Sequence, residues 1–233
     1  MHIQFISDLH EKFPYITPQA DYIALIGDVA NPFDERYVIY LSYLSQLFKG
    51  VFVVFGNHEY YHNIMPVAEK HMENICRQFN NVFFLNNKSI LVDGYLIVGS
   101  TLWSAVEQNA FNALNCGNLI KMNKHKYMDF MDYRVLHLQC VEFIKKEIEK
   151  GYPTIILTHY APIHEMNGNR QTRLKSGFSS DLTSVLKKNV KAWLSGHTHT
   201  CITVLKEGIL FSSNCLGHMT ESCEFNVNKC IEI

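Results

Sequence analysis

The sequence lacks the features that would direct a protein to a membrane, to secretion or to a polyanion. Its 21 lysines and arginines balance 22 aspartates and glutamates, so a formal charge of −1 gives no overall field to attract nucleic acid. The opening residues MHIQFISDLH contain no basic leader or cleavage site, and no apolar run approaches the length of a transmembrane helix. Seven cysteines without a CxxC pair favour a reduced chain over a disulfide framework. The sequence therefore predicts a cytoplasmic protein that does not act at a membrane.

The chain also lacks internal repeats, low-complexity segments and linkers rich in proline, glycine or serine. Apolar residues make up 47% of the 233 residues and charged residues 18%, which is typical of a globular protein with a sizeable core. We therefore predict a single domain that spans residues 1–233.

Short apolar runs alternate with helical patterns through the first half of the chain. Four runs, at 3–7, 22–27, 51–56 and 82–85, have the composition of buried strands. Apolar residues recur at helical spacing between the second and third runs and between the third and fourth. This alternation predicts an α/β fold with a mostly parallel sheet covered by helices. The further predicted elements are a hairpin at 89–100, a helix at 132–150, strands at 154–159 and 192–197, a short helix capped by Asp181, and strands of a second sheet through the tail to 233.

Residues 104–131 interrupt this order, with many asparagines, mixed charge and weak periodicity. Long irregular segments in compact domains are often functional. We predict that this segment is an insertion that caps the crevice in which the site lies.

Polar side chains follow five of the apolar runs at the point where each ends. In VFVVFGNHEYY, for example, Asn57, His58 and Glu59 come directly after a buried strand and a glycine. Carboxyl ends of neighbouring strands share one edge of an α/β sheet, so these side chains should converge on one crevice. The expected metal ligands are Asp8, His10, Asp28, Asn57, His159, His197 and His199.

Carboxylate, amide and imidazole donors without thiolate suit Mn, Fe, Zn, Ni or Mg. Seven such donors are too many for a single ion. Two ions about 3.5–4 Å apart, bridged by one carboxylate, form a standard clamp for phosphoryl transfer.

The motifs DxH, GD, GNHE, a lone histidine and GHxH, in this order from residue 7 to residue 199, resemble those of the calcineurin-like metallophosphoesterase superfamily. The resemblance implies a two-sheet β-sandwich flanked by helices and two divalent metal ions, with manganese favoured. It implies that Asp28 bridges the two ions. The first would be held by Asp8, His10, Asp28 and His199, and the second by Asp28, Asn57, His159 and His197.

The remaining candidates concern the substrate. His58 would protonate the leaving oxygen or bind a phosphoryl oxygen, and His164 and His218 are candidate substrate contacts. Unlike the protein serine/threonine phosphatases, the chain has GDVANPF in place of GDxxDRG and so lacks the phosphate-binding arginine. We therefore predict a phosphodiesterase acting on a small, nucleotide-like substrate rather than on long nucleic acid. The alternatives are a nuclease of the same superfamily, a phosphomonoesterase, and a metal-stabilised binding module without turnover.

Overall fold

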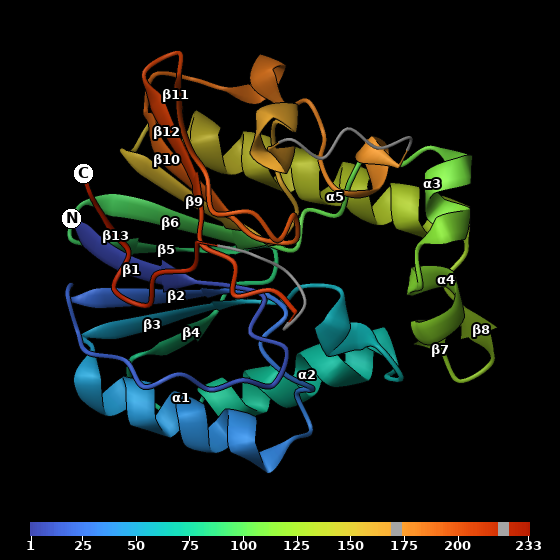
Figure 1. Cartoon of the computed structure of the whole chain (residues 1–233), viewed down its shortest axis with the longest axis horizontal. Coiled ribbons are helices and arrows are strands. Elements are labelled where there is room, and N and C mark those ends of the chain that lie inside the picture. The colour runs from blue at the N-terminus through green and yellow to red at the C-terminus, as the bar shows by residue number, and fades with distance from the viewer. Residues whose placement is uncertain (169–173, 219–223) are drawn as a thin grey trace.

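A computed structural model describes residues 1–168, 174–218 and 224–233. Two β-sheets pack face to face, with α1 and α2 covering the outer face of one sheet and α5 that of the other (Figure 1). This α/β/β/α arrangement confirms the predicted two-sheet sandwich flanked by helices. The long helices are α1 (Glu35–Leu47), α2 (Met65–Cys76) and α5 (Phe130–Glu149).

The first sheet has the order β13-β1-β2-β3-β4, and β1 to β4 run parallel. Each of the first three strands is a run of five mostly apolar residues, as expected for strands covered on both faces. The bounds are β1 (His2–Ile6), β2 (Tyr22–Ile26), β3 (Gly50–Val54), β4 (Val82–Phe84) and β13 (Cys230–Glu232).

The second sheet has the order β11-β12-β10-β9-β6-β5. Its four inner strands are parallel and end together, because Ser100, Thr158, Ser195 and Ser213 pair in one row. The bounds are β5 (Lys88–Val92), β6 (Tyr95–Ser100), β9 (Thr154–Thr158), β10 (Val190–Ser195), β11 (Thr203–Lys206) and β12 (Ile209–Ser213).

The core has two parts that hold these layers together. Between the sheets lies a fully apolar cluster that includes Phe5, Phe52, Ile155 and Leu194, all without solvent exposure. A larger cluster fills the space between the sheets and the helices. Because the inner strands of both sheets are buried on both faces, their ends give well-packed supports for polar side chains.

The segment after β6 builds a small subdomain beyond the strand ends, on the right in Figure 1. It contains α3 (Gln108–Ala113), α4 (Cys116–Leu119) and a hairpin of β7 (Lys121–Asn123) and β8 (Lys126–Tyr127). Single 3₁₀ turns lie elsewhere, namely η1 (His58–Tyr60), η2 (His164–Asn167), η3 (Lys175–Gly177) and η4 (Thr183–Val185).

Three expectations about elements are corrected. The end of the tail does not extend the second sheet, because β13 pairs antiparallel with β1 in the first sheet. The helix predicted from 132 begins at Phe130, where Asp129 and Asp132 form a reciprocal capping box. The helix predicted after Asp181 is only the single turn η4, although the Asp181 carboxylate does accept the N–H of Thr183.

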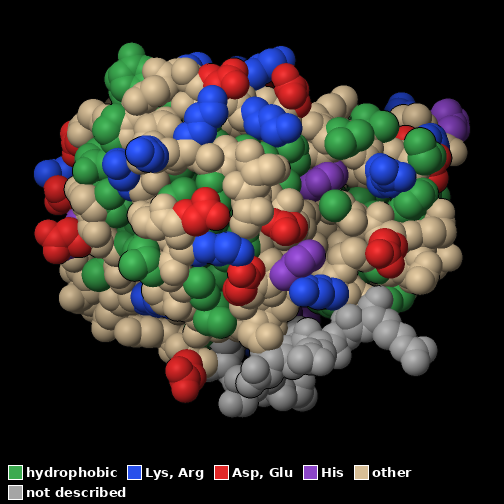
Figure 2. Space-filling model, turned by 90° about the horizontal axis from the view of Figure 1, so that it is seen from above, with side chains coloured by type: hydrophobic (Ala, Val, Ile, Leu, Met, Phe, Trp, Pro, Cys, Tyr) green, Lys and Arg blue, Asp and Glu red, His purple; other side chains and the backbone are tan. Residues whose placement is uncertain are grey.

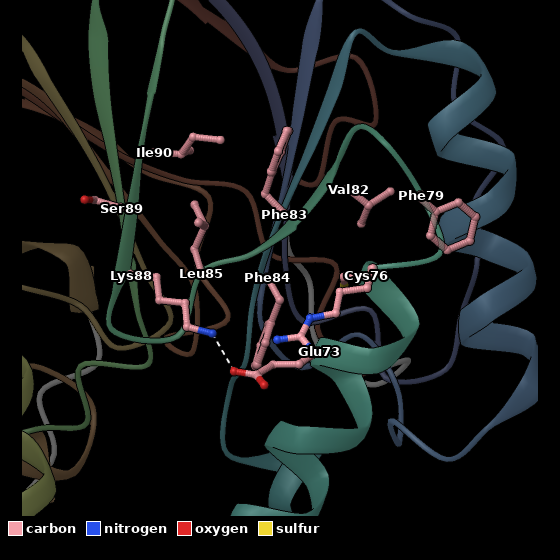
Figure 3. Close-up of a pocket in the computed structure, with 11 residues that line it drawn as sticks. Glu73, Cys76, Phe79, Val82, Phe83, Phe84, Leu85, Lys88, Ser89 and Ile90 are labelled. Atoms are coloured by element: carbon pink, nitrogen blue, oxygen red, sulfur yellow. Dashed lines mark hydrogen bonds and ion pairs between the residues drawn. The ribbon is translucent and has the colours of Figure 1, made fainter.

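The open edges of the two sheets, β4 and β5, border a groove of about 380 Å³ beside the end of α2 (Figure 3). Phe83, Leu85 and Ile90 line it, and an ion pair between Lys88 and Glu73 crosses it. None of the expected ligands lies among its lining residues. Among the described parts of the chain, no helix is both long and apolar enough to cross a membrane.

Candidate metal centre

The expected ligands lie where the inner strands end. Asp8 and His10 follow β1, Asp28 follows β2 and Asn57 follows β3. From the second sheet, His159 directly follows β9, while His197 and His199 follow β10. The structure brings these side chains from both sheets together, as the following distances show.

Five of these seven residues have a left-handed backbone, which L-residues rarely adopt. The φ angles are +55° for Asp8, +46° for His10, +53° for Asp28, +63° for His197 and +48° for His199. Such conformations cost free energy and persist only where the surrounding structure imposes them, which makes them frequent at functional sites. Here the first two loops support each other, because Asp8 N–H donates to the Gly27 carbonyl and His10 N–H to that of Asp28.

Glycines make the close approach of the ligands possible. A Cβ atom on Gly56 would lie 2.2 Å from Asp28 Oδ1 and 2.7 Å from the His159 ring. One on Gly27 would lie 2.4 Å from His159 Nδ1, and one on Gly196 2.7 Å from Asp8 Oδ2. Cβ atoms in proteins essentially never come this close to another atom. The GD, GNHE and GH motifs therefore need glycine at these positions for the expected ligands to lie so close together.

Around Asp28, three acceptor atoms face one another. His159 Nδ1 lies 2.9 Å from the Ile26 carbonyl oxygen and donates to it, which leaves Nε2 with a lone pair. That Nε2 is 3.2 Å from Asn57 Oδ1 and 3.4 Å from Asp28 Oδ2. His197 Nε2 similarly faces the Gly177 carbonyl, at 3.3 Å, so its Nδ1 is the free acceptor. Converging acceptors of this kind fit a divalent cation, and Asp28, His159 and His197 form a group that could hold one.

A second set of donors adjoins the first. His10 Nε2 is 3.1 Å from His199 Nε2, and Asp8 Oδ1 is 3.3 Å from the same His199 atom. His10 also groups with Asp28 and His58, so Asp28 lies near His10 as well as near His159 and His197. This position is the one that a bridging carboxylate requires. The donor set thus fits two adjacent divalent ions.

The acids give the site a strong negative field. Burial alone would raise the pKa of Asp28, but the nearby His159 and His58 rings hold it well below its usual range. Burial opposes a proton on His159, yet the charge of Asp28 outweighs this and raises the pKa of His159 to about 9. Burial lowers the pKa of His197 to about 3 and that of His10 to about 4. The field that would hold a proton on His159 is the field that attracts a metal ion.

Glu59 supports the ligand loops, as a buried hydrogen-bond acceptor. Its carboxylate accepts the backbone N–H groups of Asp28, Val29 and Gly56 at 2.7–2.9 Å. These bonds tie the end of β2 to the end of β3. Ser7 acts similarly on the first loop, because its hydroxyl donates to Asp8 Oδ2 at 2.6 Å.

Two cavities adjoin the centre. One of about 300 Å³ is lined by polar groups including Glu11, Asn31 and His62. The other, of about 230 Å³, lies between the ligands and the insertion, with Leu114 and Phe178 in its wall. Four residues line both cavities, and we call them the partition: Asp28, His58, Tyr61 and His218.

The three candidate substrate contacts differ in position. The His58 side chain is 40% exposed, with Nε2 3.8 Å from Asp28 Oδ2. His218 stacks on the His10 ring at 4.2 Å. By contrast, His164 is not among the lining residues of either cavity, and its Nδ1 faces the Ser179 hydroxyl at 2.8 Å. A substrate contact by His164 stays a prediction that the cavities do not support.

Tyr61 was not among the residues that the sequence predicted for the site. Its hydroxyl lies 2.9 Å from Asn57 Nδ2, and its ring is 4.4 Å from that of His58. It follows Asn57 by four residues across the turn η1. A spacing of about one helical turn after a ligand is the signal that would have indicated it.

Comparisons with known proteins indicate a family and a relative in sequence. A family model described as calcineurin-like phosphoesterase matches residues 1–201. An uncharacterized protein of Acanthamoeba polyphaga mimivirus is 31% identical over 234 residues, which cover 91% of this chain and 84% of that protein.

Two solved structures share the fold. The phosphopantetheinyl hydrolase of Mycobacterium tuberculosis superposes with a TM-score of 0.66 at 17% identity, over 93% of this chain and 89% of the other. A putative 5'-nucleotidase of Staphylococcus aureus gives 0.50 at 13% identity, over 92% of this chain and 48% of the other.

Proposed function

Because the chain belongs to the calcineurin-like phosphoesterase family, we propose that it is a two-metal phosphodiesterase that hydrolyses a small, nucleotide-like diester. The proposed ligands are Asp8, His10, Asp28 and His199 for one ion, and Asp28, Asn57, His159 and His197 for the other. Manganese is the favoured metal, since hard oxygen donors and imidazoles suit it. Two bound ions would lower the pKa of water and offset the charge of the phosphoryl group.

The observation that carries the choice of a diester is the pair of cavities. A phosphodiester has two ester groups, and the cavities on the two sides of the partition offer a place for each. The cavity under the insertion has apolar walls at Leu114 and Phe178, which suits a planar base or acyl group. The other has amide, carboxylate and imidazole groups, which suit a hydroxyl-bearing group.

The charges of the cavity walls favour a diester over a monoester. Among the described residues that line the two cavities, there is no lysine or arginine. A monoester carries up to two negative charges and is usually held by such groups, whereas a diester carries one. Glu11, in one wall, is paired with Arg36 at 2.9 Å and supplies no positive charge to a dianion.

The chain's own groups have distinct roles in this proposal. His58, between the two cavities, would donate a proton to the leaving alkoxide oxygen. His218, stacked on His10, would donate a hydrogen bond to a phosphoryl oxygen. The buried Glu59 would keep the Asp28 and Asn57 loops in place during turnover.

The alternatives have weaker support. A nuclease would need a basic track, whereas Figure 2 shows lysines and arginines interspersed with acidic side chains across the face it presents. The two solved relatives are named for phosphopantetheinyl and nucleotide substrates, which supports a small phosphate ester. A binding module without turnover leaves the exposed His58 between the cavities unexplained.

The test is a turnover comparison on protein loaded with Mn²⁺. We expect kcat/KM for bis(4-nitrophenyl) phosphate and cyclic nucleotides to exceed that for 4-nitrophenyl phosphate by at least about tenfold, about 1.4 kcal/mol in barrier. Asp28→Asn should abolish turnover and lower Mn²⁺ content at both sites, because its carboxylate faces both donor sets. Faster cleavage of the monoester would show a phosphomonoesterase. A metal-loaded protein without turnover on any ester would show a binding module.

A further inference from the structure

The Tyr61 hydroxyl contacts the side-chain amide of Asn57, one of the proposed metal ligands. The side-chain amide of Asn57 is nearly symmetric in shape, with an oxygen on one side and an NH₂ group on the other. Its Oδ1 points inward, 3.2 Å from His159 Nε2, and its Nδ2 points outward to the Tyr61 hydroxyl at 2.9 Å. Only the oxygen can bind a cation, so the amide must keep this orientation.

In the flipped orientation, the amide would present its NH₂ group, which can only donate, to the centre and would have no atom there that can bind a cation. The partner of the outward atom therefore matters. Asn57 is buried, so its outward NH₂ group cannot turn to bulk water for a partner. The Tyr61 hydroxyl is held in place by its ring, which packs against His58, and by its position beside Cys116 Sγ at 4.0 Å in α4.

We propose that Tyr61 is a positioning residue, which stabilises the metal-binding orientation of Asn57 by accepting a hydrogen bond from its outward NH₂ group. This inference rests on the proposed two-metal centre. A cation on Oδ1 withdraws electron density from the amide and makes Nδ2 a stronger donor, so the bond to Tyr61 strengthens when the metal binds. The hydroxyl thereby raises the affinity of the second site without contacting the ion.

The same hydroxyl should have the opposite effect on a carboxylate. In Asn57→Asp, either oxygen can bind the metal. The outward oxygen accepts a hydrogen bond from Tyr61, whereas the NH₂ group of Asn57 donates one to it. A cation on the inner oxygen makes the outer oxygen a weaker acceptor. Loss of the Tyr61 hydroxyl should then leave metal affinity unchanged or increase it.

The experiment is a Mn²⁺ titration of metal-free protein, with free Mn²⁺ measured by its electron paramagnetic resonance signal. Wild-type protein should bind two ions, and Tyr61→Phe should weaken one site by roughly 10–100-fold. In the Asn57→Asp background, Tyr61→Phe should weaken no site by more than about threefold. The matched control is Tyr60→Phe, which removes the neighbouring hydroxyl, bonded to Glu69, and should leave both affinities unchanged.

Each other outcome is decisive. An equal loss in both backgrounds would show that Tyr61 only packs the fold, and two unchanged sites in Tyr61→Phe would show that its hydroxyl has no role. In either case the two-metal centre would stand and this inference would fall. A wild-type protein that binds fewer than two ions would overturn the proposed centre and the inference with it.

Discussion

His58 adjoins the proposed metal ligands, but its side chain is 40% exposed whereas that of Asp28 is 1% exposed. Its backbone N–H donates to Asp28 Oδ1 at 2.9 Å, which fixes the residue at the end of β3, while its ring extends into the crevice. A ring so placed can donate a proton to a leaving group or stabilise phosphoryl charge. These two roles differ in their dependence on the leaving group.

We expect His58→Asn to slow hydrolysis of an alkyl diester by roughly 10²–10⁴-fold, about 3–5 kcal/mol of barrier. An alkoxide needs a proton to depart, whereas a nitrophenolate leaves as a stable anion. Hydrolysis of bis(4-nitrophenyl) phosphate should therefore be largely spared, and the kcat of both substrates is the measurement.

Metal content serves as the control and should stay near the wild-type value. An equal loss on both diesters would assign His58 to charge stabilisation. Unchanged rates on both would remove it from the mechanism.

At the scale of elements, the insertion has two parts that differ in their distance from the chemistry. Residues 113–116, where α3 ends and α4 begins, line the cavity beside the proposed ligands. The turn of the β7–β8 hairpin is exposed and lines neither cavity. A role in choosing the substrate should therefore belong to the first part.

Leu114→Ala should raise KM for diesters whose group enters the apolar cavity, and more for larger groups. A loss of about 1–2 kcal/mol of contact corresponds to roughly 5–30-fold in KM. Lys124→Ala, in the exposed turn, is the matched control and should leave KM unchanged. Steady-state kinetics on a series of diesters with aryl and methyl groups measures both. The same KM values in wild-type and Leu114→Ala protein, across the series, would exclude the insertion from substrate selection.

The elements that the sequence predicts well are those with a strong local pattern. The five-residue apolar strands and the polar side chains after them could be located without the structure, because burial on both faces and a shared sheet edge leave few arrangements. The position of β13 could not be predicted. Cys230–Glu232 alternates like any edge strand, and three residues carry too little information to identify the strand with which they pair. Tyr61 was missed because its role depends on the geometry of η1 rather than on strand periodicity.

At the scale of the whole molecule, the centre joins the two sheets, and His137 joins α5 to the segment beside it. His137 is buried, and its Nδ1 lies 3.0 Å from the Leu102 carbonyl oxygen. Leu102 and Trp103 both have positive φ, so this bond supports a strained turn. Burial lowers the pKa of His137 in the folded protein.

This shift predicts how stability depends on pH. In the unfolded chain a histidine takes up a proton below about pH 6.5, whereas buried His137 stays neutral to a lower pH. The contribution of His137 to the unfolding free energy is therefore complete above about pH 6.5. It is lost as the pH falls, by at most about 1.4 kcal/mol per pH unit. His137→Gln should lose less unfolding free energy than wild type between pH 7 and pH 5, measured by urea denaturation with chelator present.

The other histidines titrate in both proteins and cancel in this difference. Equal losses in the two proteins would contradict a neutral, buried His137. The comparison needs no substrate and no metal, so it is independent of the proposed activity.

The left-handed backbone at Asp8, His10, Asp28, His197 and His199 has a consequence for laboratory evolution. Each such position costs on the order of 1 kcal/mol, which glycine would recover. A library selected only for heat resistance, in the presence of a chelator, should therefore accumulate glycine at these five positions before it changes the apolar strands. Selection for stability and selection for chemistry act against each other at the same residues of this chain.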